Sequence, residues 1–174
     1  MKYLVKLFVV TFFVIASTPS YSEQKIVVLD MNYILNQSNA GKGAQDFLKK
    51  KFKENQKKFV DQEKALKDEE SDLLGKKNIL TKDDYTKQSA ELRKKVISYQ
   101  TLRRKALDEI TTKRSESRKK LLASIEPILD SYIKENNISL VIDKKNMLGG
   151  SNSLDITKII VKKLDKELPS LNLK

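Results

Sequence analysis

The feature that most constrains this chain is one short apolar run, KIVVLD at residues 25–30, whose next counterpart appears only at residues 138–142, ISLVI. The first run is apolar and β-branched, which is typical of a strand buried on both faces. A lone strand cannot satisfy its own backbone N–H and C=O groups. We therefore expect the two runs to pair, and everything between them to be an excursion that returns to its starting point.

The excursion is helical. From about Ala44 to Leu74 apolar side chains recur every seven residues, and they are Phe52, Phe59, Leu66 and Leu73. The companion heptad positions are polar, so this seam is one residue wide where a coiled coil uses two. Asn39, Gly41 and Gly43 are expected to break the pattern before it. The segment is predicted to be a narrow amphipathic helix that is held weakly to its neighbour.

A turn and a second, longer helix follow. Gly75 is expected to end the first helix in the left-handed region. Thr81-Lys82-Asp83-Asp84 resembles a capping box at the start of a helix that runs to about Asn136. Pro127 lies inside this helix, so we expect a bend near Glu126 or a break into two helices.

Because the turn is short, the two helices should lie antiparallel and form a hairpin arm. We place this arm at residues 44–129, with its turn near residues 75–81, and a small β-rich head at residues 23–43 and 130–174. A head of this size is marginal alone, and its open strand edges invite pairing with another chain. The sequence predicts an α+β fold whose heads associate, and the strand residues proposed for that interface are Ile26, Val28, Leu140 and Ile142.

The last part of the head carries turn and cap signals. Asp143-Lys144-Lys145-Asn146 is typical of a turn, and Met147-Leu148-Gly149 is predicted to form a short returning strand. Ser153 or Asp155 is expected to cap a final amphipathic helix, which Pro169 ends.

The first 22 residues are interpreted as a secretory signal peptide. Lys2 and Lys6 precede the apolar run Leu7–Ala16, and the small residues Ser20 and Ser22 precede an expected cleavage site before Glu23. A membrane anchor is the alternative, but the apolar run is shorter than the roughly 20 residues that span a bilayer. The mature chain is therefore expected to be exported, with 33 basic and 23 acidic residues, a formal charge of +10.

Composition excludes several kinds of chemistry. The chain has no His and no Cys, which removes thiol nucleophiles, Cys/His metal sites, His-based catalytic triads and disulfides. Asp30 and Asp143 each end a predicted strand and could form an acid/base pair. Acids in such places are far more often turn formers. We therefore predict that the protein is not an enzyme and needs no cofactor.

The order of these segments resembles the Skp/OmpH family of periplasmic chaperones. The resemblance covers KIVVLDMNYILNQSNAGKGAQDFLKKKFK, the long basic hairpin and ISLVIDKKNMLGGSNSLDITKIIVKKL, and it is most specific in this closing segment. It implies a homotrimer in the periplasm of a Gram-negative bacterium, with a β-barrel-like body and arms that enclose a cavity. It also implies that unfolded outer-membrane β-barrel proteins are held there without ATP and passed on for insertion.

Charge is uneven along the arm. Residues 42–75 carry nine Lys against eight acids, whereas residues 76–120 carry fifteen Lys or Arg against six acids. These clusters could be a solvated helix face, or they could attract acidic partners such as unfolded outer-membrane proteins or anionic lipid.

Particular arm residues are candidates for these roles. The client-binding candidates are Phe47, Val60, Leu74, Ile79 and Leu80, which fall off the seam, and the basic residues Arg93, Lys94, Lys95, Arg103 and Arg104. Ordinary packing against the neighbouring helix is the alternative for each apolar residue. The resemblance also implies lipopolysaccharide or anionic membrane as a partner, for which Lys113 and Arg114 are the candidates.

Two other functions compete with the chaperone interpretation. A nucleic-acid binder would use the basic helices to grip phosphate, but an exported protein rarely meets nucleic acid, and no aromatic platform or zinc signature is present. We therefore expect no nucleic-acid partner. A coiled-coil envelope scaffold would require a continuous seam two residues wide, which the residues from Phe52 to Leu73 do not provide.

Overall fold

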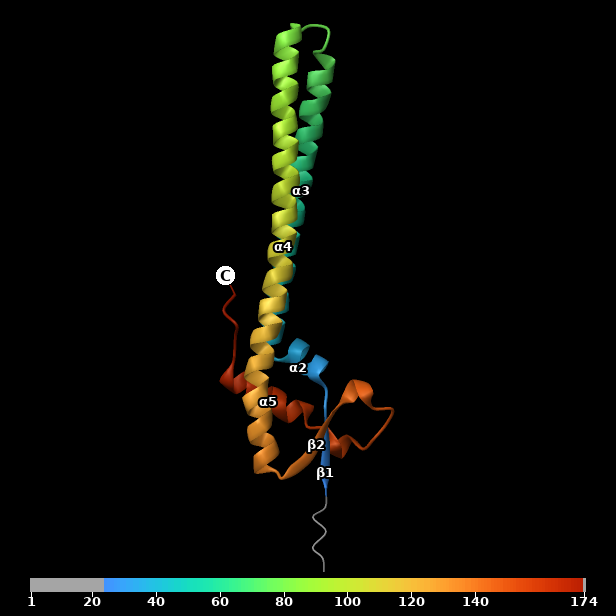
Figure 1. Cartoon of the computed structure of the whole chain (residues 1–174), viewed down its shortest axis with the longest axis vertical. Coiled ribbons are helices and arrows are strands. Elements are labelled where there is room, and N and C mark those ends of the chain that lie inside the picture. The colour runs from blue at the N-terminus through green and yellow to red at the C-terminus, as the bar shows by residue number, and fades with distance from the viewer. Residues whose placement is uncertain (1–23, 174) are drawn as a thin grey trace, which may run out of the picture.

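The computed structural model describes residues 24–173 of the chain, so the predicted signal peptide lies outside the described residues. Two long helices form an arm that rises from a small head (Figure 1). The elements in chain order are β1 (Lys25–Leu29), α2 (Met31–Gln37), α3 (Asn39–Gly75), α4 (Lys82–Glu135), β2 (Ile138–Asp143), two 3-10 turns, η1 (Lys144–Asn146) and η2 (Asn152–Leu154), and α5 (Thr157–Glu167).

The two predicted strands pair, which confirms that the helical excursion returns to its start. β1 and β2 are parallel, with Ile26 opposite Leu140 and Leu29 opposite Asp143. The pairing is parallel because α4 runs down beside the head to Glu135 and the chain reverses at Asn136 and Asn137, where Asn137 has a φ of 51°, so that β2 starts in the same direction as β1. The predicted returning strand at residues 147–149 is wrong. Asp143 accepts a hydrogen bond from the Lys145 N–H (3.2 Å), and the chain enters η1 instead.

The first arm helix begins earlier than the sequence predicted. Ser38 is its N-cap, and the Ser38 hydroxyl accepts the N–H of Gly41 (3.2 Å). Residues 39–43 therefore lie inside α3, and the expectation that they break the helix is wrong. Gly41 has a packing role, because a Cβ there would lie 2.2 Å from the carbonyl oxygen of Leu35.

The arm turn lies where it was predicted, with one difference. No glycine in the described chain has a positive φ, so the expected left-handed Gly75 is wrong. The helix ends instead with the Lys76 N–H shared between the Asp72 and Leu73 carbonyls, 3.2 Å from each. The capping box is confirmed: Thr81 is the N-cap of α4, and its hydroxyl accepts the N–H of Asp84 (3.2 Å).

Pro127 does not divide the second arm helix. α4 runs without interruption to Glu135, so the predicted break is wrong. Ile125 and Ile128, on either side of the proline, are 1% and 4% exposed and belong to the head core. Their burial holds both halves of the helix in place and offsets the roughly 3 kcal/mol that an interior proline costs.

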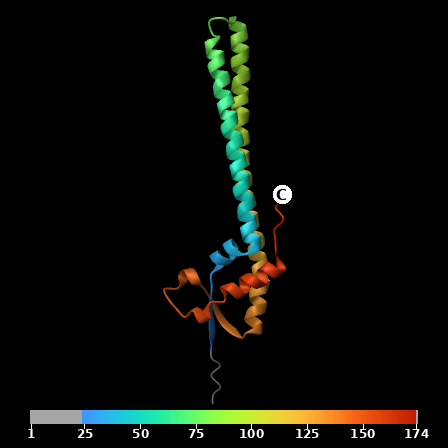
Figure 2. The same ribbon diagram turned by 180° about the vertical axis from the view of Figure 1, so that it is seen from behind.

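The head core lies where α2, α4, α5 and β1 meet. Its most deeply buried large side chains are Ile34, Ile125, Ile160 and Leu164. Asp155 accepts the N–H of Thr157 (2.9 Å) at the start of α5, but Ile156 is the N-cap residue, and the expectation of a Ser153 cap is wrong. Seen from behind, α5 crosses the lower part of α4, and the chain then turns upward beside the arm (Figure 2).

Candidate binding surface of the helical arm

The tip of the arm is apolar and basic together. Ile79 is 81% exposed, Leu74 next to the turn is 59% exposed, and Leu80 is half-buried. Lys76 and Lys77, both exposed, lie between Leu74 and Ile79 in the turn. The tip thus presents positive charge beside apolar surface at the point of the molecule farthest from the head (Figure 1).

Below the tip the arm is held by few buried side chains. On α3 only Phe59 and Leu73 of the predicted seam are buried, while Leu66 is half-buried and Phe52 is 47% exposed. The narrow seam is therefore confirmed in position, but its lower end faces solvent. A groove of about 550 Å³ runs between the helices here, and its apolar and aromatic lining residues are Leu66, Leu73, Leu74, Tyr85, Leu92, Val96 and Tyr99.

An aromatic contact and a hydrogen bond join the two helices in the middle of the arm. The Phe59 and Tyr99 rings meet edge to face with centroids 6.0 Å apart, and the Tyr99 hydroxyl donates to Glu63 (3.3 Å). The hydrogen bond from Lys67 lowers the pKa of the Glu63 carboxyl. Exposed pairs of this kind contribute little, and the buried Gln62 Oε1 has no hydrogen-bond partner within the described chain. The middle of the arm is therefore weakly stabilised.

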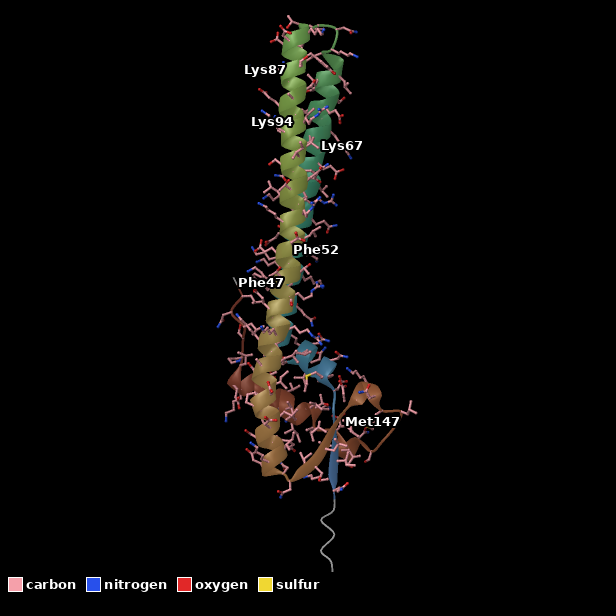
Figure 3. The ribbon with its side chains drawn as sticks, in the orientation of Figure 1. Phe47, Phe52, Lys67, Lys87, Lys94 and Met147 are labelled. Atoms are coloured by element: carbon pink, nitrogen blue, oxygen red, sulfur yellow. The ribbon has the colours of Figure 1, made fainter. Side chains whose placement is uncertain are left out.

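The structure separates the predicted basic candidates into three groups. Arg93 and Arg103 line the groove between the helices. Lys95 instead bonds to Glu69 across the hairpin, so its charge is partly neutralised. Lys94 and Arg104 are exposed, and Figure 3 shows Lys94 along the side of α4 that faces away from α3.

The apolar candidates on α3 are also divided. Val60 is 58% exposed and lines a smaller recess of about 220 Å³, together with Phe52 and Leu107. Phe47 is half-buried, with the Lys51 ammonium 5.9 Å from its ring centroid, so packing accounts for much of its surface. Sequence reasoning missed Leu107 and the exposed Ile97 because the apolar spacing of α4 does not show which face is covered.

The neighbouring Lys113 and Arg114 do not share one site. Lys113 lies 4.0 Å from Glu109 in an i,i+4 pair. Arg114 lines a groove of about 590 Å³ at the base of the arm, where Arg118 and Lys49 also lie. Helical spacing could have identified Arg118, which is one turn after Arg114, but the contribution of Lys49 requires the packing of α3 on α4. The apolar lining of this basal groove consists of Leu35, Gly41, Ala44, Leu48, Phe52 and Leu121.

The head candidates differ in exposure. Ile26 and Leu140 are opposite each other in the sheet and are 39% and 52% exposed. Ile142 is half-buried. Val28 is 3% exposed, and its carbonyl accepts the Ile156 N–H (2.9 Å), so it packs inside its own chain.

The two strand-end acids have local structural roles. Asp30 is the N-cap of α2 and accepts the N–H of Tyr33 (2.8 Å). Asp143 caps η1 and lies 3.3 Å from the Lys145 ammonium. Residues 24–173 contain no cluster of acids that could hold a metal ion. No helix within the same residues is long and apolar enough to cross a bilayer.

Comparison with known proteins gives a consistent result. The family model described as outer membrane protein (OmpH-like) matches residues 25–164. A solved structure of a candidate outer membrane chaperone (OmpH-like) from Caulobacter crescentus is similar, with a TM-score of 0.80 and 18% identity, covering 91% of this chain and 94% of that one. No match was found among curated proteins. Because this family model matches residues 25–164, which include both the arm and most of the head, the chain belongs to the OmpH-like family.

Proposed function

We propose that this protein is an ATP-independent holdase chaperone of the periplasm, which keeps unfolded outer-membrane β-barrel proteins soluble for insertion. The observation that carries the proposal is the composition of the arm surface. Exposed apolar side chains, such as Ile79, Leu74 and Val60, lie among basic ones on a hairpin whose helices are weakly packed.

Such a surface suits a client that has no fixed shape. The basic excess of α4 attracts acidic chains at long range, and this attraction weakens with salt. Long Lys and Arg side chains add apolar cover beneath their charges. A weakly packed arm opens at low free-energy cost, so it can adjust to clients of different size.

We further propose that the heads associate, and that the assembly is a homotrimer with a barrel-like body and arms around a cavity. Ile26 and Leu140 support association, since they are an exposed apolar pair in register on one small sheet. In the described residues β2 also has no strand on its outer edge, and an open edge favours pairing with another chain. The number three rests on the resemblance to the family.

An anionic lipid, including lipopolysaccharide, is a second proposed partner. The basal groove has an apolar wall and carries three basic residues, Arg114, Arg118 and Lys49, against one acid, Asp46. This basic excess suits an amphiphile with an anionic headgroup. Vesicles with and without anionic lipid provide the test. Cosedimentation that requires anionic lipid and falls several-fold in Arg114→Ala/Arg118→Ala supports the site, and equal binding to neutral vesicles contradicts it.

The holdase proposal is tested with mature protein, residues 23–174. A urea-unfolded outer-membrane barrel protein is diluted into it, and the soluble species are weighed by light scattering after size exclusion. We expect a free mass of three chains that gains one client. If the free protein is a monomer or dimer and the client precipitates as it does alone, the proposal is wrong and an envelope scaffold becomes the better interpretation.

A further inference from the structure

The chain continues past its last helix in an ordered way that the family match does not include. The matched residues end at 164, α5 ends at Glu167, and the structure describes a further six residues, 168–173. We call residues 168–173 the tail. Pro169 prevents continuation of the helix. The Asn172 N–H then donates to Ser170 Oγ (3.1 Å), and Asn172 has a φ of 49°, which forms a local turn.

The tail packs on the junction between head and arm. Leu168 and Leu171 lie against the core cluster that includes Leu121 and Ile125 of α4. Figures 1 and 2 agree that the tail turns back after α5 and runs beside α4 toward the arm. The tail therefore packs on the head core to which α4 contributes Leu121, Ile125 and Ile128, and it continues alongside the lower arm.

The helix before the tail is itself fixed to both legs of the arm. Asp165 accepts the N–H of Asn39, the first residue of α3 (2.6 Å). Lys163 lies 3.5 Å from Glu135 and 5.7 Å from the ring centroid of Tyr132, near the end of α4. The tail therefore starts from α5, which is bonded to the first residue of α3 and to the end of α4.

The arm is loosely packed just above this junction. Leu48 is buried on α3, but Phe52, one turn farther along, is 47% exposed, and the basal groove opens between them and α4. On α4 the small Ser117 occupies the facing buried position. Bending is easiest where few apolar contacts resist it, so we expect the arm to bend at this level, which lies beside the tail.

We propose that the tail is a brace: Leu168 and Leu171, packed where α4 leaves the head, restrict the angle through which the hairpin arm swings. Removal of the Leu171 contact leaves α5 and the core in place but frees this lower segment of the arm. The arm then samples a wider range of angles relative to the head. A wider range of arm angles would let the protein hold clients of a wider range of sizes. Only this consequence rests on the proposed holdase function.

The test measures the swing directly. The chain has no Cys, so Lys105→Cys and Lys158→Cys, both exposed, allow specific spin labelling of one arm position and one α5 position. Labelled chains are diluted with unlabelled ones so that each assembly carries one labelled protomer. We expect Leu171→Asp to broaden the electron-electron distance distribution roughly twofold, because the arm can then move relative to the head. Truncation after Pro169 should have the same effect.

The matched control is Asn172→Asp, which adds the same charge one residue away at an exposed position that tolerates aspartate at positive φ. It should leave the distribution unchanged. The brace proposal is wrong if the distance distributions of wild type, Leu171→Asp and the truncated chain are equally broad. A client-aggregation assay on the same variants separates the two proposals. If Leu171→Asp widens the distance distribution but no variant, including wild type, prevents client aggregation, the brace is supported and the holdase proposal is wrong.

Discussion

The contact between Phe59 and Tyr99 should decide how readily the outer arm opens. Phe59 is 8% exposed and is the only buried apolar residue on α3 between Leu48 and Leu73. An aromatic side chain that loses roughly 150 Å² of buried area at about 25 cal/mol/Å² forfeits about 4 kcal/mol. The recess and groove beside the ring let the neighbours relax into the space, so we expect Phe59→Ala to cost about 3 kcal/mol.

This cost should be local to the arm. Hydrogen exchange measured by mass spectrometry on peptides from residues 60–98 should accelerate on the order of 100-fold, since about 1.4 kcal/mol corresponds to a factor of ten. Peptides from β1 should exchange as in wild type, because the head core shares no buried side chain with this part of the arm.

Phe52→Ala is the matched control, since it removes the same side chain one heptad earlier on the same helix. Phe52 is 47% exposed, so about half the area is lost and the cost should be roughly 1 to 2 kcal/mol. Two results refute the reasoning. Equal acceleration by the two substitutions shows that the Tyr99 contact is not special, and equal acceleration in β1 shows that arm and head unfold as one unit.

Three further predictions concern other parts of the chain. Gly41→Ala should lower the free energy of unfolding by about 2 kcal/mol or more, because the added Cβ would meet the carbonyl oxygen of Leu35. Gly43→Ala, whose Cβ would have nothing within 4 Å, should raise the free energy of unfolding by about 0.5 to 1 kcal/mol. Urea titration compares the two variants, and equal midpoints would refute the packing role of Gly41. Burial alone would raise the pKa of Asp155, but hydrogen bonds from Lys144 and Thr157 lower it to about 2 from an ordinary 3.8. Its contribution to stability should therefore be full above about pH 4 and be lost as pH falls through about 2, so Asp155→Asn should flatten this part of the stability curve, and parallel curves would contradict the assignment. Ile79→Ser should weaken client retention several-fold with a stability change within about 0.5 kcal/mol, because this side chain is 81% exposed; unchanged retention at unchanged stability would remove the tip from the binding surface.

Local signals in the sequence determined the plan of the arm. Thr81 and Asp84 form the predicted cap, and the turn between the helices lies at the predicted place. The pairing of the strands around residues 26–29 and 138–142 also followed, because an isolated strand must find a partner and residues 138–142 form the next apolar, β-branched run of similar length. The cap and the turn depend on residues close in sequence, and the strand pairing depends on the need of backbone N–H and C=O groups for partners, so no tertiary information was needed to predict them.

The tertiary structure decided the features in which distant residues compete with local preference. Gly41 and Gly43 suggested a helix break, but the close approach of Leu35 and the Ser38 cap place them inside α3. Pro127 suggested a break in α4, but burial of its isoleucine neighbours in the head core outweighs the cost of the proline.

The candidate surface shows the same division. Composition identified the basic character of α4, but only packing separates Arg93 in the groove from Lys95, which Glu69 holds. The contact of Leu171 with the core likewise had no sequence signal, because a single leucine after a proline shows no repeating apolar spacing from which burial can be predicted. Periodicity records which residues are apolar along one element, whereas the partner that covers each of them is fixed only when the elements come together.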